Sequence, residues 1–449
     1  MGRLFGTDGV RSKAGDYPLD VPTVRRLGAA LAKSLGHHGG TVRFLAGRDT
    51  RESGDWIERE LAYGMSSQGA QCVSAGVIPT PAIAYLTPRL GFTAGVVISA
   101  SHNPFGDNGI KVFSGGGEKF TETLEREVEA LVADPGLVVP DGDARTVEAG
   151  NNFRGEYEAH LRDIAADTPA MIGMQVGIDC ANGATTTVAP ELFEALGIRA
   201  HRIGCEPDGR NINLGCGSTA PQGLARLVVD RELPIGIAYD GDGDRAIFVD
   251  ERGSVVDGDA IMLICAKQLQ REGRLKGGAI VATVMSNIGL EIALRQEGIG
   301  LKRCPVGDKY VMEEMARQGL SLGGEQSGHI IFSDYLFTGD GLATSLQVLR
   351  TMAITGRSLA ELAADLTTYP QVLLNVRVAQ KVDLASVPPV AHTMADVESR
   401  LAGNGRLLVR YSGTEPLLRI MIEGQDQDEI AAWAEEIAAS VRQHLVAAV

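Results

Sequence analysis

The segment Ile235–Val249, IGIAYDGDGDRAIFV, contains two short apolar runs separated by an acidic, glycine-rich loop. Runs of this length, rich in β-branched and aromatic residues and followed by a Gly/Asp cluster, are typical of strands. The segment therefore predicts a strand, a turn and a returning strand. Asp240, Asp242 and Asp244 alternate with glycine, and a turn of this kind can aim three carboxylates at one hard cation.

Two other structures could contain a loop of this composition. A calcium EF-hand requires glycine at the sixth loop position and helices on both sides, but Arg245 occupies that position and the flanks are strand-like. A solvated acidic hairpin tip is the structural alternative. The strand flanks and the lack of lysine within the loop favour metal binding. Three carboxylates leave coordination positions open, which suits a Mg²⁺ ion whose coordination shell is completed by a phosphate oxygen. We also expect the loop to be exposed.

A second loop follows the buried-strand run Gly95–Ile98 and carries Ser101 and His102. A serine at a strand end can act as a nucleophile or phosphate carrier, with His102 and Lys111 supplying charge or proton transfer. It can equally well cap the following turn. Spacing alone leaves these two interpretations balanced.

Two further strand-like runs stop in polar loops. Glu325, Ser327 and His329 offer mixed donors and acceptors for sugar hydroxyls or an amine, a weak signal by itself. The loop near the C-terminus supplies guanidinium groups, hydroxyls and backbone N–H groups that glycine leaves accessible, and these are suited to binding an anion. An ordinary turn is the alternative. The candidate residues of this loop are Arg410, Ser412, Gly413, Thr414 and Arg419.

Short strand-like runs alternate with helical patterns along the chain of 449 residues, which predicts an α/β protein. A Pro- and Gly-containing linker is expected at 134–152, and the sheets are expected to be mainly parallel. Four domains are predicted at 1–150, 151–255, 256–368 and 369–449. The first three are α/β and the last is a smaller α+β domain. Because ligands sit at the carboxyl ends of strands in open α/β sheets, the four loops are expected to face one central cleft.

The net charge of −15 gives no general attraction to nucleic acid or to an anionic membrane. The six cysteines contain no C-x-x-C pair, and no run of 18 apolar residues or signal-peptide core is visible. We therefore expect a cytoplasmic protein with reduced thiols. A homodimer is a possible assembly.

The four loops, in this order, resemble the α-D-phosphohexomutase superfamily over essentially the whole chain. The serine loop with Asp107–Lys111 (DNGIK), the acidic loop and the phosphate loop mark the superfamily, as does Leu4–Arg11 (LFGTDGVR). Ser12 is a departure, since the family usually continues with glycine there. The glucosamine-phosphate branch, rather than the phosphomannomutase/phosphoglucomutase branch, is favoured by three further segments: Asp208–Thr219, Val306–Val311 and Gly324–His329.

The resemblance implies a role for each loop. Ser101 would carry a phosphoryl group, and the three aspartates would hold Mg²⁺ with an oxygen of that phosphoserine. Arg245 would support the phosphoserine, and Lys111 would be a proton-transfer candidate. Glu325 and Ser327 would grip sugar hydroxyls, and the 410–419 region would hold the idle phosphate.

The implied activity is a Mg²⁺-dependent mutase that converts glucosamine 6-phosphate into glucosamine 1-phosphate through a 1,6-bisphosphate, for amino-sugar nucleotide and cell-wall synthesis. Its active form would be phosphorylated on Ser101. One alternative is a phosphomannomutase or phosphoglucomutase. A second alternative is a non-catalytic protein that binds Ca²⁺ or a sugar phosphate with the same loops.

Overall fold

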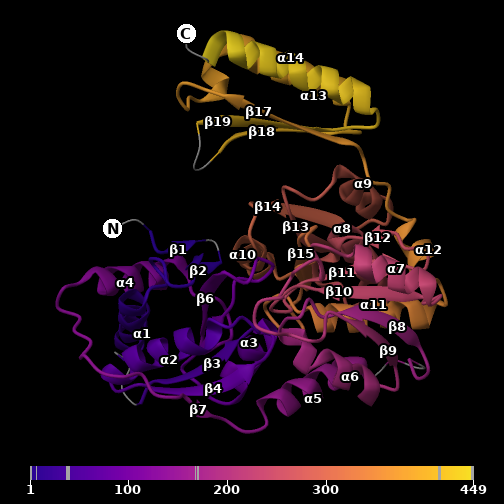
Figure 1. Ribbon diagram of the computed structural model, residues 1–449. Coiled ribbons are helices and arrows are strands. Elements are labelled where there is room, and N and C mark those ends of the chain that lie inside the picture. The colour runs from indigo at the N-terminus through magenta and orange to yellow at the C-terminus, as the bar shows by residue number, and fades with distance from the viewer. Residues whose placement is uncertain are drawn as a thin grey trace. The chain divides into compact units, whose positions relative to one another are not determined.

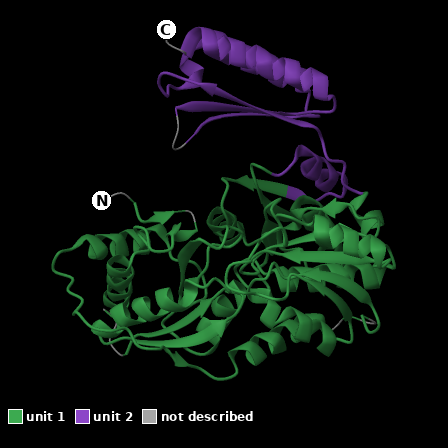
Figure 2. Cartoon of the chain, viewed as in Figure 1, with its two compact units in different colours: residues 1–285, 301–364 green, residues 286–300, 365–449 purple. Residues whose placement is uncertain are grey.

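The computed structural model describes residues 3–6, 8–36, 41–166, 168, 171–412 and 416–445. The chain forms two compact units (Figure 2). The first unit contains residues 1–285 and 301–364, and the second contains residues 286–300 and 365–449.

The first unit begins with a seven-stranded sheet of order β1-β2-β6-β5-β3-β4-β7 (Figure 1). Its strands are β1 (Phe5–Gly6), β2 (Gly9–Lys13), β3 (Arg43–Arg48), β4 (Gln71–Val77), β5 (Ala94–Ile98), β6 (Asp107–Ser114) and β7 (Glu148–Ala149). Strands β5, β3, β4 and β7 are parallel neighbours, whereas β6 is antiparallel to both β5 and β2. The β5–β6 connection therefore reverses direction over the Ser101 loop.

Four helices accompany this sheet: α1 (Val21–Leu35), α2 (Gly54–Ser67), α3 (Thr80–Arg89) and α4 (Glu122–Ala133). Asp20 caps the N-terminus of helix α1, and its carboxylate accepts a hydrogen bond from Thr23 N–H. Helices α1 and α2 pack with their backbones in near contact, since a Cβ on Gly28 would lie 2.1 Å from the Leu61 carbonyl oxygen. Any larger residue at position 28 would force the two helices apart.

A second sheet of the first unit has the order β12-β11-β10-β8-β9. Its strands are β8 (Gln175–Asp179), β9 (Arg199–Ile203), β10 (Ile235–Tyr239), β11 (Ala246–Asp250) and β12 (Val255–Val256). Strand β10 is parallel to β8 and antiparallel to β11. Four helices accompany this second sheet: α5 (Phe153–Ala165), η2 (Ala184–Thr187), α6 (Ala189–Ala195) and α7 (Gln222–Asp230).

A third sheet has the order β14-β13-β15-β16 and completes the first unit. Its strands are β13 (Ala279–Thr283), β14 (Gly300–Cys304), β15 (Leu322–Gly324) and β16 (Ile330–Phe332). Its helices are α8 (Gly258–Arg271), η3 (Lys276–Gly278), α10 (Asp308–Gln318), α11 (Gly341–Thr355) and α12 (Leu359–Ala363). Helix α11 is buried along most of its length, including polar residues such as Thr344 and Ser345, whose hydroxyls donate to backbone carbonyls of the preceding turn.

The second unit contains a three-stranded antiparallel sheet of order β17-β19-β18. Its strands are β17 (Gln371–Arg377), β18 (Arg406–Tyr411) and β19 (Leu417–Glu423), and its helices are α9 (Ile288–Gln296), η4 (Leu384–Ser386), α13 (Pro388–Leu401) and α14 (Gln427–Leu445). Residues of α13, α14 and β19 share one apolar core that includes Val397, Ile420 and Ile437. This sheet thus has one face packed on helices, which is ordinary for an antiparallel sheet.

The predicted fold class is confirmed: three mixed α/β sheets precede a smaller α+β segment with a three-stranded sheet. One finer expectation was wrong: the sheets are not mainly parallel, because strands such as β6, β11 and β16 pair antiparallel with their neighbours. The expected linker at 134–152, all of which the structure describes, has no regular element other than β7, which pairs with β4 over two residues. Among the helices that the structure describes, none has the length and apolar character to cross a membrane.

Candidate functional site

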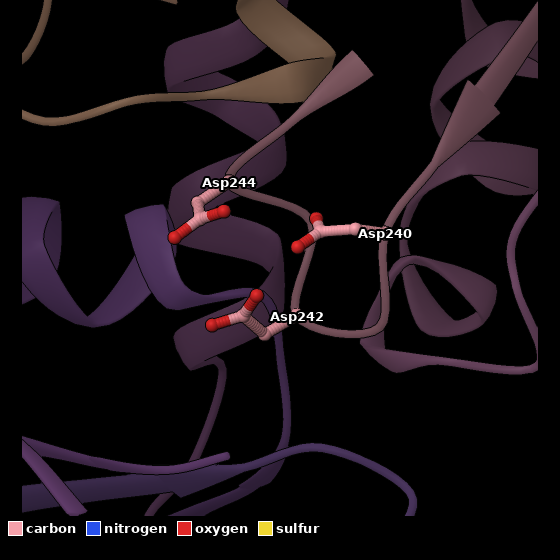
Figure 3. Close-up of side chains that lie close together, drawn as sticks. All are labelled: Asp240, Asp242 and Asp244. Carbon is pink, nitrogen blue, oxygen red and sulfur yellow. The ribbon is translucent and has the colours of Figure 1, made fainter. Parts of the chain in front are cut away.

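The acidic loop joins β10 to β11, whose register pairs Tyr239 with Ala246. Asp240, Asp242 and Asp244 each offer a carboxylate oxygen, and these three oxygens lie within 4.8 Å of one another (Figure 3). The expectation of an exposed loop was wrong: the three residues are 0 %, 0 % and 3 % exposed. Other loops of the first unit cover the turn, which sequence adjacency does not reveal.

A lysine from another sheet balances part of this charge. Lys111 on β6 places Nζ 2.8 Å from Asp242 Oδ2 and 3.1 Å from Asp244 Oδ2. Burial would raise the pKa of Asp244, but Lys111, His329 and Arg245 hold that pKa well below its usual value. Burial and the neighbouring carboxylates raise the pKa of Asp240 well above its usual value. The loop is therefore a buried, incompletely neutralised group of acids.

One oxygen of the group is suited to bind a cation. Asp242 Oδ1 is buried and has no hydrogen-bond partner within the described part of the chain, while Oδ2 of the same carboxylate accepts from Thr80 Oγ1 at 2.6 Å and from Lys111. A buried acceptor without a partner carries a desolvation cost that a metal ion would remove. The donor set, all oxygen, fits a hard cation such as Mg²⁺.

Ser101 lies beside this acidic group. Its side-chain Oγ donates a hydrogen bond to Asp240 Oδ2 at 2.5 Å, and the residue is fully buried. His102 Nδ1 lies 3.3 Å from Ser101 Oγ and 3.1 Å from Arg245 Nη1. Burial and the Arg245 guanidinium lower the pKa of His102. The structure thus brings the predicted residues Ser101, His102, Lys111 and Arg245 together with the three aspartates, from two different sheets.

Sequence reasoning missed several members of this network. Asp8 lies 3.2 Å from Lys111 Nζ, and Arg11 and Lys119 also pair with it. Burial opposes ionisation of Asp8, but Lys111, Lys119 and Arg11 keep its pKa well below the usual value. In the sequence, only the resemblance over Leu4–Arg11 marks the segment that contains Asp8 and Arg11. The sequence gives no local signal that these charged residues pair with Lys111, because the fold brings them together from distant positions.

The Glu325–His329 loop follows β15 and divides into two parts. Glu325 Oε1 accepts from Gly307 N–H at 3.0 Å, its Oε2 accepts from Ser327 Oγ at 3.3 Å, and Ser327 is exposed. His329 is 1 % exposed, with Nδ1 3.7 Å from Asp244 Oδ1 and Nε2 accepting from Gly339 N–H. Ser327 is exposed and Glu325 is partly buried, whereas His329 lies against the acidic loop. The predicted roles of all three residues in sugar binding stay predictions.

The anion-binding candidates belong to the second unit. Arg410 on β18 and Arg419 on β19 are directly opposite in register, so their side chains share one face of the sheet. Two guanidinium groups on one face of a sheet suit the binding of phosphate oxygens. Ser412 is buried at the end of β18 and its carbonyl accepts from Lys381 Nζ at 2.6 Å. Gly413 and Thr414 lie outside the described residues.

Comparison with known families defines the class of protein. Four models of the phosphoglucomutase/phosphomannomutase family match in order: alpha/beta/alpha domain I at residues 2–136, domain II at 156–253, domain III at 257–369 and the C-terminal domain at 373–440. The serine loop, the acidic loop, the Glu325 loop and the arginine pair each fall in a different one of these four domains.

Similar curated proteins narrow the class. Phosphoglucosamine mutases of Solibacter usitatus and Moorella thermoacetica are 48 % and 50 % identical to this chain, over 98 % and 96 % of its length and 99 % and 97 % of theirs. The chain therefore belongs to the phosphoglucosamine mutase family.

Solved structures share the fold at lower identity. A phosphoglucomutase/phosphomannomutase family protein of Burkholderia thailandensis has a TM-score of 0.79 at 22 % identity, covering 98 % of this chain and 97 % of that one. The N-acetylphosphoglucosamine mutase of Aspergillus fumigatus, in complex with GlcNAc-6P and magnesium, has a TM-score of 0.67 at 19 % identity, covering 98 % and 95 %.

Proposed function

We propose that this chain is an isomerase that converts glucosamine 6-phosphate into glucosamine 1-phosphate, with Ser101 as the phosphoryl carrier and Mg²⁺ as the cofactor. The observation that carries the proposal is the 2.5 Å hydrogen bond from Ser101 Oγ to Asp240 within a buried group of three carboxylates. The family membership supports the reaction type, and the names of the curated relatives support the amino-sugar substrate.

The reaction would proceed in two transfers. Phospho-Ser101 gives its phosphoryl group to O1 of glucosamine 6-phosphate, which forms the 1,6-bisphosphate. After the bisphosphate turns, its O6 phosphoryl group returns to Ser101 and leaves glucosamine 1-phosphate. The two transfers balance, so the phosphorylated enzyme is regenerated without another phosphate donor.

Asp240, Asp242 and Asp244 would hold Mg²⁺, together with an oxygen of phosphorylated Ser101. When bound, the cation neutralises charge on the transferred phosphoryl group. The partnerless Asp242 Oδ1 supports this assignment because it is a buried anionic ligand atom. His102, adjacent to Ser101 Oγ, and Arg245, which contacts His102, would orient the phosphoryl group. Lys111 would support charge or proton transfer at the sugar oxygen.

The substrate would be held away from the reacting oxygen by two sets of residues. Glu325 and Ser327 would bind sugar hydroxyls or the amino group, with His329 behind them against the acidic loop. Arg410, Ser412, Gly413, Thr414 and Arg419 would hold whichever phosphate is idle. A guanidinium fork suits this task because it binds phosphate oxygens in pairs.

The decisive experiment is the intact mass of the purified chain before and after incubation with glucosamine 1,6-bisphosphate. We expect one added phosphoryl group on the wild type, none on Ser101→Ala, and turnover of glucosamine 6-phosphate that follows the phosphorylated fraction. Turnover that is independent of phosphorylation would exclude the mechanism. Faster turnover of glucose or mannose phosphates than of the glucosamine substrate would instead favour the phosphomannomutase or phosphoglucomutase alternative.

A further inference from the structure

The Ser101 loop is part of a cluster of unusual backbone conformations. Of the seven non-glycine residues with positive φ in the described chain, four lie around this loop: Ser101 (φ 53°), Ala181 (φ 53°), Asn182 (φ 48°) and Asn213 (φ 58°). A non-glycine residue in this region is held there by its surroundings, at a conformational cost. Ser101 would relax to an ordinary conformation unless specific contacts prevented it.

Ser99 Oγ accepts from the Ser101 N–H at 2.9 Å, and two further side chains donate to the Ser101 carbonyl. Arg51 Nη2 donates to the Ser101 carbonyl at 3.1 Å and to the Asn103 carbonyl at 2.6 Å. Asn213 Nδ2 donates to the same two carbonyls at 2.9 and 3.0 Å. The Ser101 carbonyl also faces Gly241 of the acidic loop, where a Cβ would lie only 2.5 Å from it. The orientation of the Ser101 peptide is therefore determined from three sides.

The two donors come from different sheets. Arg51 follows β3, is 2 % exposed and pairs with Asp49. Asn213 lies in the connection between β9 and α7, and its own N–H donates to the Ala181 carbonyl at 2.9 Å. Position 213 has a positive φ and supplies an amide donor. Asparagine suits both requirements, because it tolerates positive φ better than most residues.

Further hydrogen bonds join the segments that bear Arg51 and Asn213. Glu52 N–H donates to the Gly209 carbonyl at 3.0 Å, and Arg210 Nε lies 2.8 Å from Glu52 Oε2. Both Arg210 and Glu52 are well exposed in this ion pair. These two segments therefore contain Asn213, which contacts the Ser101 carbonyl, and the Arg210–Glu52 ion pair, which does not. A substitution of Arg210 can serve as the control for a substitution of Asn213.

We propose that Asn213 is a positioning residue for phosphoryl transfer: with Arg51, it holds the Ser101 peptide in its left-handed conformation and so aims Oγ at the Asp240 carboxylate. This inference rests on the proposed role of Ser101 as the carrier. Without the Asn213 amide, the Ser101 and Asn103 carbonyls each lose one of their two side-chain donors, and the Ser101 peptide can rotate, which displaces Oγ. Substrate contacts at Glu325 and Ser327 do not involve this residue.

The test compares Asn213→Ala and Asn213→Gly with Arg210→Ala. Asn213→Gly removes the amide but also relieves the strain at position 213, so equal effects in both variants identify the amide as the cause. We expect kcat to fall roughly 10- to 100-fold, since a misplacement of about 1 Å can cost that much, with KM changed by less than about twofold. Arg210→Ala should stay within about twofold of wild-type kcat, as exposed ion pairs contribute little.

A second readout is the rate at which glucosamine 1,6-bisphosphate phosphorylates Ser101, followed by intact mass. Slower phosphorylation in both Asn213 variants, at a wild-type melting temperature, supports the inference. Wild-type phosphorylation rates in these variants overturn it, as does an equal loss in Arg210→Ala or a joint change of kcat, KM and melting temperature. If the wild type itself is never phosphorylated on Ser101, the proposed function fails instead.

Discussion

The serine and acidic loops of the first unit differ from the arginine pair of the second unit in how they are built. Ser101 and Asp240 are fully buried and tied to each other and to residues from several segments. Arg410 and Arg419 lie on neighbouring antiparallel strands, and Arg410 is exposed. One site is enclosed by long-range contacts, while the other is displayed on a locally formed hairpin.

This difference matches the different demands of reaction and binding. A transferring phosphoryl group requires donors and charges fixed before the reaction, because reorganising them in the transition state would raise the barrier. An idle phosphate is held similarly in the ground and transition states, so a pair of guanidinium groups on a partly exposed sheet face is sufficient. Substitutions in the two places should therefore affect kcat and KM differently.

The largest effect is expected for Ser101→Ala. The change removes the proposed phosphoryl carrier and leaves the Arg410 and Arg419 side chains intact. Turnover should fall by about three orders of magnitude or more, while substrate binding measured by calorimetry stays near the wild-type value. Ser66→Ala, on the exposed surface of α2, is the matched control. Substantial residual turnover in Ser101→Ala would show that another group carries the phosphoryl.

Asp242→Asn should have the next largest effect. It removes one anionic ligand and one of the partners of Lys111. We expect activity at limiting Mg²⁺ to drop by roughly 100-fold and to recover partly at high Mg²⁺, since ligand charge sets the affinity for the cation. Because Asp242 is buried, a stability loss of about 1–3 kcal/mol is also expected.

The measurement is a Mg²⁺ titration of activity beside a denaturant titration, with the exposed Asp143→Asn as the control. An unchanged Mg²⁺ dependence in Asp242→Asn would exclude the acidic loop as the metal site, even if the variant were less stable. The two titrations thus separate a ligand role from a purely structural one.

The contrast between enclosed and displayed sites also explains how far the sequence could be interpreted. The β10–β11 strands and the Asp240–Asp244 loop were predictable because apolar runs and a Gly/Asp turn are local signals. The burial of that loop was not, because Lys111 and Thr80 reach Asp242 across 131 and 162 residues of sequence. For the same reason, the roles of Arg51 and Asn213 at the Ser101 carbonyl had no sequence signal.

Arg419→Lys tests the displayed site. Lysine keeps the charge but loses the planar fork that binds two phosphate oxygens at once. We expect KM for glucosamine 6-phosphate to rise by roughly tenfold with kcat within about twofold, because the idle phosphate is bound equally in ground and transition states. Arg400→Lys, on helix α13 of the same unit, should leave both constants unchanged. A fall in kcat alone for Arg419→Lys would contradict the distinction between the two sites.

The smallest expected effect concerns buried acids outside the reacting groups. Asp340 begins helix α11 in the first unit, fully buried, and accepts from Tyr157 Oη at 2.8 Å and from Ala343 N–H. Burial raises its pKa from 3.8 to about 6. In the second unit, the equally buried Glu423 instead bonds the Arg406 guanidinium at 2.9 Å. The first unit thus contains a carboxyl group whose protonation is favoured by folding.

The sign of the pH effect follows from this shift. Since the folded-state pKa of Asp340 exceeds the unfolded value, its stabilising contribution is complete below pH 3.8 and is lost as the pH rises through about 6. The loss is at most about 3 kcal/mol. Asparagine stays neutral and can still cap the helix, so the melting temperature of Asp340→Asn relative to wild type should increase by a few degrees between about pH 4.5 and 7. Asp383→Asn, a cap substitution at an exposed position of the second unit, should show no such trend. A flat difference for Asp340→Asn would mean that this carboxyl group is not stabilised in its protonated form by folding.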